Sequence, residues 1–263
     1  MIKKYFIFIL FFFLVNVFAK DDIDFSGIFG KKNGCFILYD LTANRTLIHF
    51  NDNQCRMRIP PCSTFKIPLA IMSFDMSLLK DENTVIKWDG IARDLPEWNQ
   101  DQTPKTWLQY STVWVSQLLT PQLGVTKMKK YLADFQYGNK DISGGITHFW
   151  LSSSLEISGN EQLNFLIRLW RNNLAVSASA MNLTKKFLYS EKLENGGTIY
   201  GKTGAGFINN FDSKNSSRVG WFVGYLTAGK RNYVFVTNFI DKQDSKISSG
   251  AEAKDITKQI LST

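Results

Sequence analysis

Segments with the composition of β-strands lie at both ends of the chain, and helix-like segments fill the middle. Near the N-terminus, residues 35–40 and 46–50 are rich in aliphatic and aromatic side chains and flank a polar turn. After about residue 196, three more strands are predicted, at 198–203, 218–227 and 232–239. The simplest packing joins both ends in one antiparallel sheet, with terminal helices on one face and the inserted, mostly helical region on the other. The sequence therefore predicts a mixed α/β fold in which strands and helices occupy separate parts of the chain (α+β).

The helical segments can be placed by their periodicity and their end signals. Met128 and Leu132 belong to one apolar face of a helix for which Gly138 is a stop signal. Ser158 and Glu161 have the spacing of a capping box at the start of another helix. Residues 249–262 are predicted to form a closing helix.

The first residues resemble a secretory signal peptide. Lys3 and Lys4 precede an apolar run at 5–15, which is short for a membrane-spanning helix, and a small residue, Ala19, suits a cleavage site. We therefore expect residues 1–19 to be removed and residues 20–263 to form a single domain, secreted or exported to a periplasm. An uncleaved N-terminal anchor is the alternative. No later segment is apolar and long enough to span a membrane, so none is expected in the mature chain.

Charge and cysteine content exclude several classes of function. The formal net charge is +8, but no long block of basic residues occurs, so a solvated surface is favoured over a nucleic-acid site. Three cysteines and two histidines without a C-x-x-C motif argue against a metal site. Cys35 and Cys55 could form a disulfide in an oxidising compartment, which the sequence leaves open. Cys62 could be a nucleophile or a small buried filler.

An apolar helix beginning near residue 62 carries the candidate catalytic pair. Apolar residues surround it on nearly all sides, so it should be buried. Ser63 and Lys66 lie three residues apart and share one face. Ser63 would lie at the helix N-terminus, where free N–H groups and the dipole favour negative charge. Burial would lower the pKa of Lys66, so that its neutral amine could act as a base.

The spacing of Ser63 and Lys66 is weak support by itself. Ser77 and Lys80 have it too, deeper in the same predicted helix, where a structural role is favoured. The sequence offers no G-x-S-x-G elbow and no glycine-rich phosphate loop. Two further motifs strengthen the serine–lysine interpretation. They are K-T-G at 202–204, at the end of a predicted strand, and S-T-V at 111–113, in the helical region.

The order S-x-x-K, S-x-V, K-T-G is similar to that of penicillin-recognising serine enzymes. The chain most resembles the class D β-lactamases, or oxacillinases, from about residue 34 to 240. The matching motifs are S-T-F-K at 63–66, S-T-V at 111–113, Y-G-N at 137–139 and K-T-G at 202–204. The resemblance implies the β-lactamase/transpeptidase fold and an exported enzyme that hydrolyses penicillins of the oxacillin type and so confers β-lactam resistance.

The resemblance also implies a mechanism. Ser63 would form an acyl-enzyme, and Lys66 would react with carbon dioxide or bicarbonate to become N6-carboxylysine, the general base of acylation and deacylation. Trp150 would donate a hydrogen bond to that carbamate, and Val113 would cover it. Backbone N–H groups of Ser63 and Ala205 would form the oxyanion hole. No bound cofactor or metal is implied.

The remaining implied roles concern proton transfer and substrate binding. Ser111 would transfer a proton, Tyr137 and Asn139 would line the site, and substrate would contact Lys202, Thr203, Gly204, Ala205 and Ser249. Gly204 would let the backbone approach the substrate closely. The chain departs from the family because no arginine follows the strand at 232–239 to pair with the substrate carboxylate, a role that Ser248, Ser249, Lys202 and Thr203 would have to fill.

Three other functions are compatible with parts of this pattern. A penicillin-binding transpeptidase or carboxypeptidase would acylate and deacylate slowly, but the chain is short for that class. A β-lactam-sensing receptor domain would bind without turnover, but it would normally follow several membrane spans. A general secreted esterase would need a G-x-S-x-G nucleophile elbow and a catalytic histidine. The sequence contains no such elbow, and neither of its two histidines is well supported as a catalytic residue. The oligomeric state is left open by the sequence.

Overall fold

One antiparallel sheet joins the two ends of the chain. The structure is a computed structural model that describes residues 23–208, 216–242 and 245–262, so the predicted signal peptide at 1–19 lies outside the described residues. In these described ranges, six strands have the order β2-β1-β6-β5-β4-β3. Their bounds are β1 Asn33–Asp40, β2 Arg45–Phe50, β3 Tyr189–Lys192, β4 Thr198–Phe207, β5 Arg218–Ala228 and β6 Arg231–Asp241. Because β1 pairs with β6, the prediction that strands from both ends of the chain form one sheet is confirmed.

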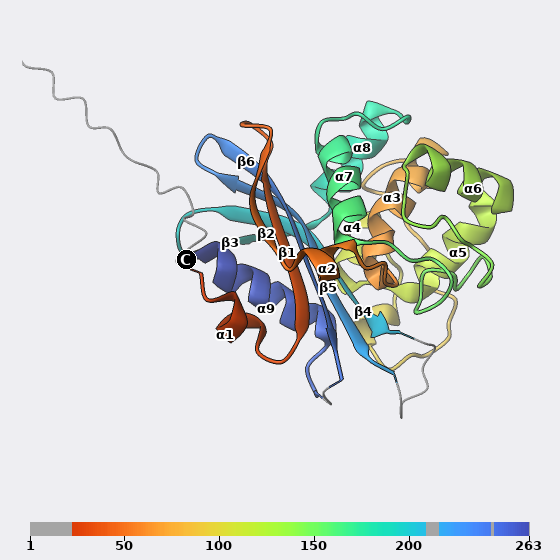
Figure 1. Cartoon of the computed structure of the whole chain (residues 1–263). Helices are drawn as coiled ribbons and strands as arrows, with labels where there is room; N and C mark the ends of the chain where they lie inside the picture. Colours follow the sequence, from red (N-terminus) through yellow and green to blue (C-terminus); the bar gives the residue numbers. More distant parts are fainter. Residues whose placement is uncertain (1–22, 209–215, 243–244, 263) are drawn as a thin grey trace, which may run out of the picture.

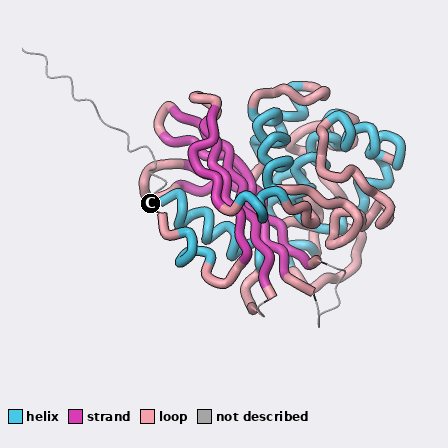
Figure 2. Tube along the Cα trace, viewed as in Figure 1, coloured by secondary structure: helices cyan, strands magenta, loops and turns pink. Residues whose placement is uncertain are grey.

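Helices cover both faces of the sheet, as predicted (Figures 1 and 2). On one side lie α1 and α9, and on the other lies the region inserted between β2 and β3. The helices are α1 Phe25–Phe29, α2 Asp52–Arg56, η2 Cys62–Phe65, α3 Lys66–Asp75, η3 Pro96–Trp98, α4 Pro104–Tyr110, α5 Val113–Leu123, α6 Val125–Asp134, α7 Gly159–Trp170, α8 Ala178–Lys186 and α9 Ser249–Ser262. Within the described ranges, no helix combines the length and apolarity needed to cross a membrane.

Strand alternation divides the interior into two cores. Phe36 and Leu38 of β1 face the α1 and α9 side, where they join Ile256 in one buried cluster. Ile37 points to the opposite face and joins the larger cluster with the inserted helices. Successive side chains of a strand point to opposite faces, so one eight-residue strand contributes to both cores.

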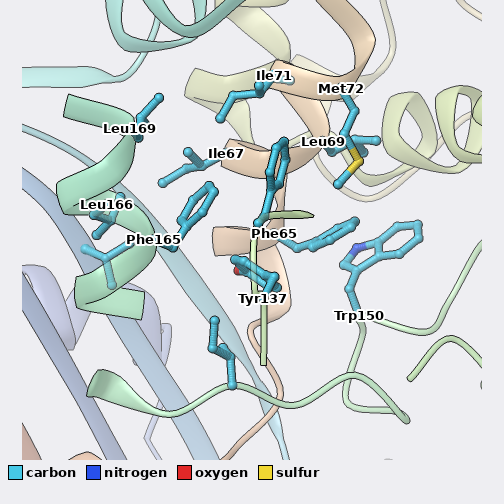
Figure 3. Close-up of a cluster of buried hydrophobic side chains, with 14 of the residues drawn as sticks. Phe65, Ile67, Leu69, Ile71, Met72, Tyr137, Trp150, Phe165, Leu166 and Leu169 are labelled. Atoms are coloured by element: carbon cyan, nitrogen blue, oxygen red, sulfur yellow. The ribbon is translucent and has the colours of Figure 1, made fainter. Parts of the chain in front are cut away.

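Helix α3 is the centre of the larger core. Every residue from Lys66 to Phe74 is buried, as its apolar composition predicts. Figure 3 shows Phe65 and Ile67 near its start, facing Phe165 of the neighbouring α7. The helix ends at Asp75, so the expectation that Ser77 lies within it is wrong. Ser77 has a φ of 57° and follows the helix in a turn.

The capping box at the start of α7 is confirmed. The Ser158 side chain accepts a hydrogen bond from the backbone N–H of Glu161, and the Glu161 carboxylate accepts one from the backbone N–H of Ser158. Both N–H groups would otherwise lack a partner within the helix. The box fixes the start of α7, which packs against α3 and the sheet.

A disulfide between Cys35 of β1 and Cys55 of α2 ties the sheet to the helical region. The two cysteines are 20 residues apart, so the bond closes a short loop. Loss of this cross-link in a Cys35→Ala/Cys55→Ala variant should lower the free energy of unfolding by about 3 kcal/mol, mainly because the unfolded chain gains freedom. Urea unfolding of the variant, and of the wild type with and without reductant, measures this. A change below about 0.5 kcal/mol would show that the bond does not stabilise the fold.

Candidate active site

Ser63 and Lys66 face each other at the start of α3. The single turn η2 carries Ser63 and runs directly into α3, so the predicted shared face is present. The Lys66 Nζ donates a long hydrogen bond of 3.5 Å to the Ser63 Oγ. Ser63 is partly exposed and lines a cleft of about 800 Å³, whereas Lys66 is fully buried beneath it. The pair thus combines an accessible hydroxyl with a protected amine.

Burial lowers the pKa of Lys66 well below its usual range, and the nearby charge of Lys202 lowers it further; Cys62 acts weakly in the opposite direction. Desolvation disfavours the charged form of an amine. The buried site therefore favours the neutral form of the Lys66 amine. A neutral amine has a free electron pair, so it can accept a proton or attack an electrophilic carbon.

A second serine–lysine pair lies beside the cleft, which its serine, Ser111, lines. The Lys202 Nζ donates a 2.9 Å hydrogen bond to the Ser111 Oγ, and a 3.1 Å bond to the Thr203 carbonyl. Ser111 follows α4 with a φ of 59°, a left-handed conformation that is uncommon outside glycine. This conformation places the hydroxyl in the cleft instead of on a helix surface. Burial lowers the pKa of Lys202 to about 7.

Strand β4 forms one wall of the cleft through Thr203 and Ala205. Gly204, between them, also has a packing role that the sequence analysis did not predict. A Cβ atom on Gly204 would lie 2.8 Å from the Pro61 carbonyl oxygen and 3.1 Å from a Thr64 methyl carbon. Glycine is therefore needed so that β4 can pack against the turn that carries the nucleophile.

Trp150 has a buried indole N–H without a hydrogen-bond partner among the described residues. Its ring stacks on Phe65, the residue before Lys66, with 5.5 Å between ring centroids (Figure 3). A buried donor left unsatisfied costs about 1–3 kcal/mol, so an acceptor in this region would be strongly favoured. A buried amine with a lowered pKa, and an unsatisfied donor packed on the residue before it, fit a carbamate on Lys66. Val113, at the start of α5, lines the cleft.

Tyr137 and Asn139 lie behind the site and not in its wall, contrary to expectation. Tyr137 is fully buried and packs edge-on against Phe65, with 5.9 Å between ring centroids. The Asn139 amide donates a 2.8 Å hydrogen bond to the Ser154 carbonyl, and its oxygen accepts a bond from the Glu156 N–H. Both residues support the loops beneath the cleft, because their polar or aromatic groups are used by protein neighbours.

Arg218 and Lys246 line the cleft but were missed in the sequence analysis. Arg218 begins β5 and forms ion pairs with Glu252 at 3.1 Å and Asp241 at 3.6 Å. Its position opposite Phe207 and Asp241 depends on strand register, which no local motif indicates. Two acids thus compensate the arginine charge.

Ser249 is at the expected end of the cleft, at the start of α9. Its hydroxyl donates a 2.7 Å hydrogen bond to the Val219 carbonyl, so its proton is already used within the protein. Ser248, the residue before α9, also lines the cleft, as does Thr203 of β4.

Comparisons with known proteins agree with this geometry. The family model of the penicillin-binding protein transpeptidase domain matches residues 34–262. Beta-lactamase OXA-1 of Escherichia coli is 42% identical over 245 residues, which are 90% of this chain and 87% of that protein. The methicillin resistance mecR1 protein of Staphylococcus aureus is 33% identical over 254 residues, 94% of this chain and 40% of that protein. The structure of class D beta-lactamase BAT-2 matches with a TM-score of 0.81 and 35% identity, covering 92% of this chain and 96% of that one. The chain is therefore a member of the class D serine β-lactamases, hydrolases of cyclic amides that belong to the penicillin-binding transpeptidase family.

Proposed function

We propose that this β-lactamase hydrolyses penicillins of the oxacillin type through an acyl-enzyme on Ser63, with a carbamate on Lys66 as the general base. The observation that carries the proposal is the fully buried Lys66 amine, whose pKa is lowered by burial, at 3.5 Å from the Ser63 hydroxyl. In the same proposal residues 1–19 are a cleaved leader, residues 20–263 form one catalytic domain, and the exported enzyme confers β-lactam resistance.

The carbamate forms when the Lys66 nitrogen bonds to the carbon of CO2 and loses a proton, and its oxygens then supply a base at neutral pH. The residues around it have separate tasks. Trp150 donates its N–H to the carbamate, and Val113 limits the access of bulk water. Because Lys66 is buried, its uncharged amine is available for the reaction.

Acylation and deacylation use the same residues. Ser63 loses its proton to the Lys66 side chain as its Oγ attacks the lactam carbonyl carbon. Backbone N–H groups of Ser63 and Ala205 stabilise the negative oxygen. The lactam C–N bond then breaks, and the proton that the Lys66 side chain took from Ser63 passes through Ser111, hydrogen-bonded to Lys202, to the leaving nitrogen. A water next loses a proton to the freed Lys66 side chain as it attacks the Ser63 ester, and that proton returns to the Ser63 Oγ when the ester C–O bond breaks.

Lys202 and Thr203 are proposed to bind the substrate carboxylate, with Ser248 and Ser249 at the edge of the same subsite. Lys202 is a suitable partner only when protonated. Since the pKa of Lys202 is lowered to about 7, the ammonium form predominates below that pH and the neutral amine above it.

For an anionic penicillin, kcat/KM should therefore fall as the pH rises above about 7, approaching tenfold per pH unit. A Lys202→Arg variant should lose this decline, because guanidinium keeps its charge. A neutral ester substrate should show no such decline with the wild type. Steady-state kinetics between pH 6 and 9 measure all three. If the neutral ester shows the same decline, binding of the substrate carboxylate by Lys202 is not its cause.

The second candidate function is a β-lactam-sensing domain that is acylated without turnover. The match to a methicillin resistance protein that is not named a β-lactamase is the observation that favours it. Steady-state hydrolysis of benzylpenicillin, combined with intact-mass analysis, separates the two. Many turnovers per protein and little acyl-enzyme at the end support the β-lactamase. One equivalent of stable acyl-enzyme without further product would contradict it.

A further inference from the structure

Three residues near Ser63 meet at the outer edge of β4. Cys62, the residue before the nucleophile, is buried and has a φ of 50°. Ser152, two residues after Trp150, is buried and has a φ of 47°. A Cβ atom on Gly206 would lie 2.5 Å from the Cys62 Sγ and 2.7 Å from the Ser152 Oγ. A side chain of η2 and one of the loop after Trp150 therefore lie against the same backbone position of β4.

Ser152 also makes a hydrogen bond to the strand itself. The backbone N–H of Phe207 donates a 2.8 Å bond to the Ser152 Oγ. Among the described residues, β3 pairs with β4 only from Thr198 to Gly201. Beyond Gly201, no strand within the described ranges lies beside the outer edge of β4, and an edge held on one side shifts more easily. Ser152 takes the place of a neighbouring strand at this end.

Cys62 holds the other side of the contact. Its thiol donates a 3.5 Å bond to the Pro60 carbonyl, which also accepts a 2.9 Å bond from the Trp221 indole of β5. Burial raises the pKa of the thiol to about 12, so it stays protonated and is not a nucleophile. The left-handed conformation of Cys62 costs about 1–3 kcal/mol, so it persists only where surrounding contacts offset that cost. The contacts of Cys62 with the Pro60 carbonyl and with β4 do this.

We propose that Ser152, braced by Cys62, is a positioning residue that fixes the end of β4 so that the Ala205 N–H points at the reacting carbonyl oxygen. Ala205 lies two residues before Phe207 on the pinned strand. The inference rests on the proposed oxyanion role of Ala205. Because Ser152 and Trp150 belong to one loop, the same loop would position groups on both sides of Ser63.

The test compares variants at Ser152 with a matched serine. Ser152→Ala removes the acceptor, and Ser152→Gly removes it while adopting the left-handed φ without strain. Ser154→Ala is the control, because the Ser154 Oγ accepts a 2.9 Å bond from the Gly144 N–H in the same loop but away from β4. Two quantities are measured. The first is the second-order rate constant for acylation of Ser63 by a chromogenic β-lactam, and the second is the affinity for a boronic acid that forms a tetrahedral adduct on Ser63.

Both Ser152 variants should acylate roughly tenfold to a hundredfold more slowly and bind the boronic acid more weakly by a similar factor, because a misplaced oxyanion donor costs up to about 10²–10³ in rate. Amide hydrogen exchange at Phe207 should become faster. Ser154→Ala should acylate as the wild type does. Unchanged acylation in both Ser152 variants would overturn the inference, and so would a loss in Ser152→Ala that Ser152→Gly restores, since backbone strain would then be the cause. Acylation without turnover in the wild type would contradict only the proposed hydrolysis.

Discussion

Replacing Lys66 by alanine should lower the turnover of benzylpenicillin by about 10³-fold or more. General-base catalysis by one side chain contributes about 10²–10⁴, and here the same side chain would serve in both half-reactions. The fold should tolerate the change, because removing a buried amine removes its desolvation cost. The measurement is kcat with saturating bicarbonate, together with the urea unfolding midpoint.

Lys80→Ala provides the matched control. Ser77 and Lys80 have the same spacing as Ser63 and Lys66, but Lys80 is exposed beyond the end of α3. Its removal should leave turnover unchanged. If Lys66→Ala retained more than about a tenth of wild-type turnover, Lys66 would not be the base.

Replacing Trp150 by phenylalanine should make turnover strongly dependent on bicarbonate. Phenylalanine keeps an aromatic ring against Phe65 but removes the buried N–H that lacks a partner among the described residues. Loss of one donor to an anion costs about 1.5–3 kcal/mol, so the bicarbonate concentration for half-maximal activity should rise roughly tenfold to a hundredfold. Titration of kcat with bicarbonate measures the shift.

Trp107→Phe is the control for this effect. The Trp107 indole is equally buried but donates a 3.1 Å hydrogen bond to the Ser116 hydroxyl. Its replacement should lower stability without moving the bicarbonate titration. An equal loss of activity at every bicarbonate concentration in Trp150→Phe would argue against a role of the indole in holding the carbamate.

Most of the fold could be predicted because strand alternation and helix capping are local signals. The pairing of β1 with β6 followed from placing apolar strands at both ends of the chain. Strand β3, with the sequence Y-S-E-K, was missed because two of its four residues are charged and it lies at the sheet edge. Such a strand is defined by its partner β4 and not by its own composition.

The site could be predicted only where its residues are close in sequence or belong to a motif. Ser63 and Lys66 are three residues apart, so helix geometry brings them together. Ser111 and Lys202 are 91 residues apart, and their hydrogen bond depends on how the helical region packs on β4. Arg218 reaches the cleft through strand register. Contacts of that kind are set by tertiary packing, which spacing does not encode.

At 137–139 the sequence motif predicted a position in the cleft that the structure does not show. A match of letters suggested that Tyr137 and Asn139 line the cleft, but the left-handed Gly138 between them turns the chain beneath it. A Cβ atom on Gly138 would lie 2.0 Å from the Glu156 carbonyl oxygen, so this turn packs tightly against the loop after Trp150. Its contribution is to hold that loop in place.

The carbamate on Lys66 is tested most directly by 13C NMR of the protein in 13C-labelled bicarbonate. The account predicts one protein-bound carbamate signal in the wild type, which is absent in Lys66→Ala and disappears in acid together with turnover. It also predicts that the signal in Trp150→Phe appears only at higher bicarbonate. Full penicillin turnover under conditions in which the wild type shows no carbamate signal would contradict the account.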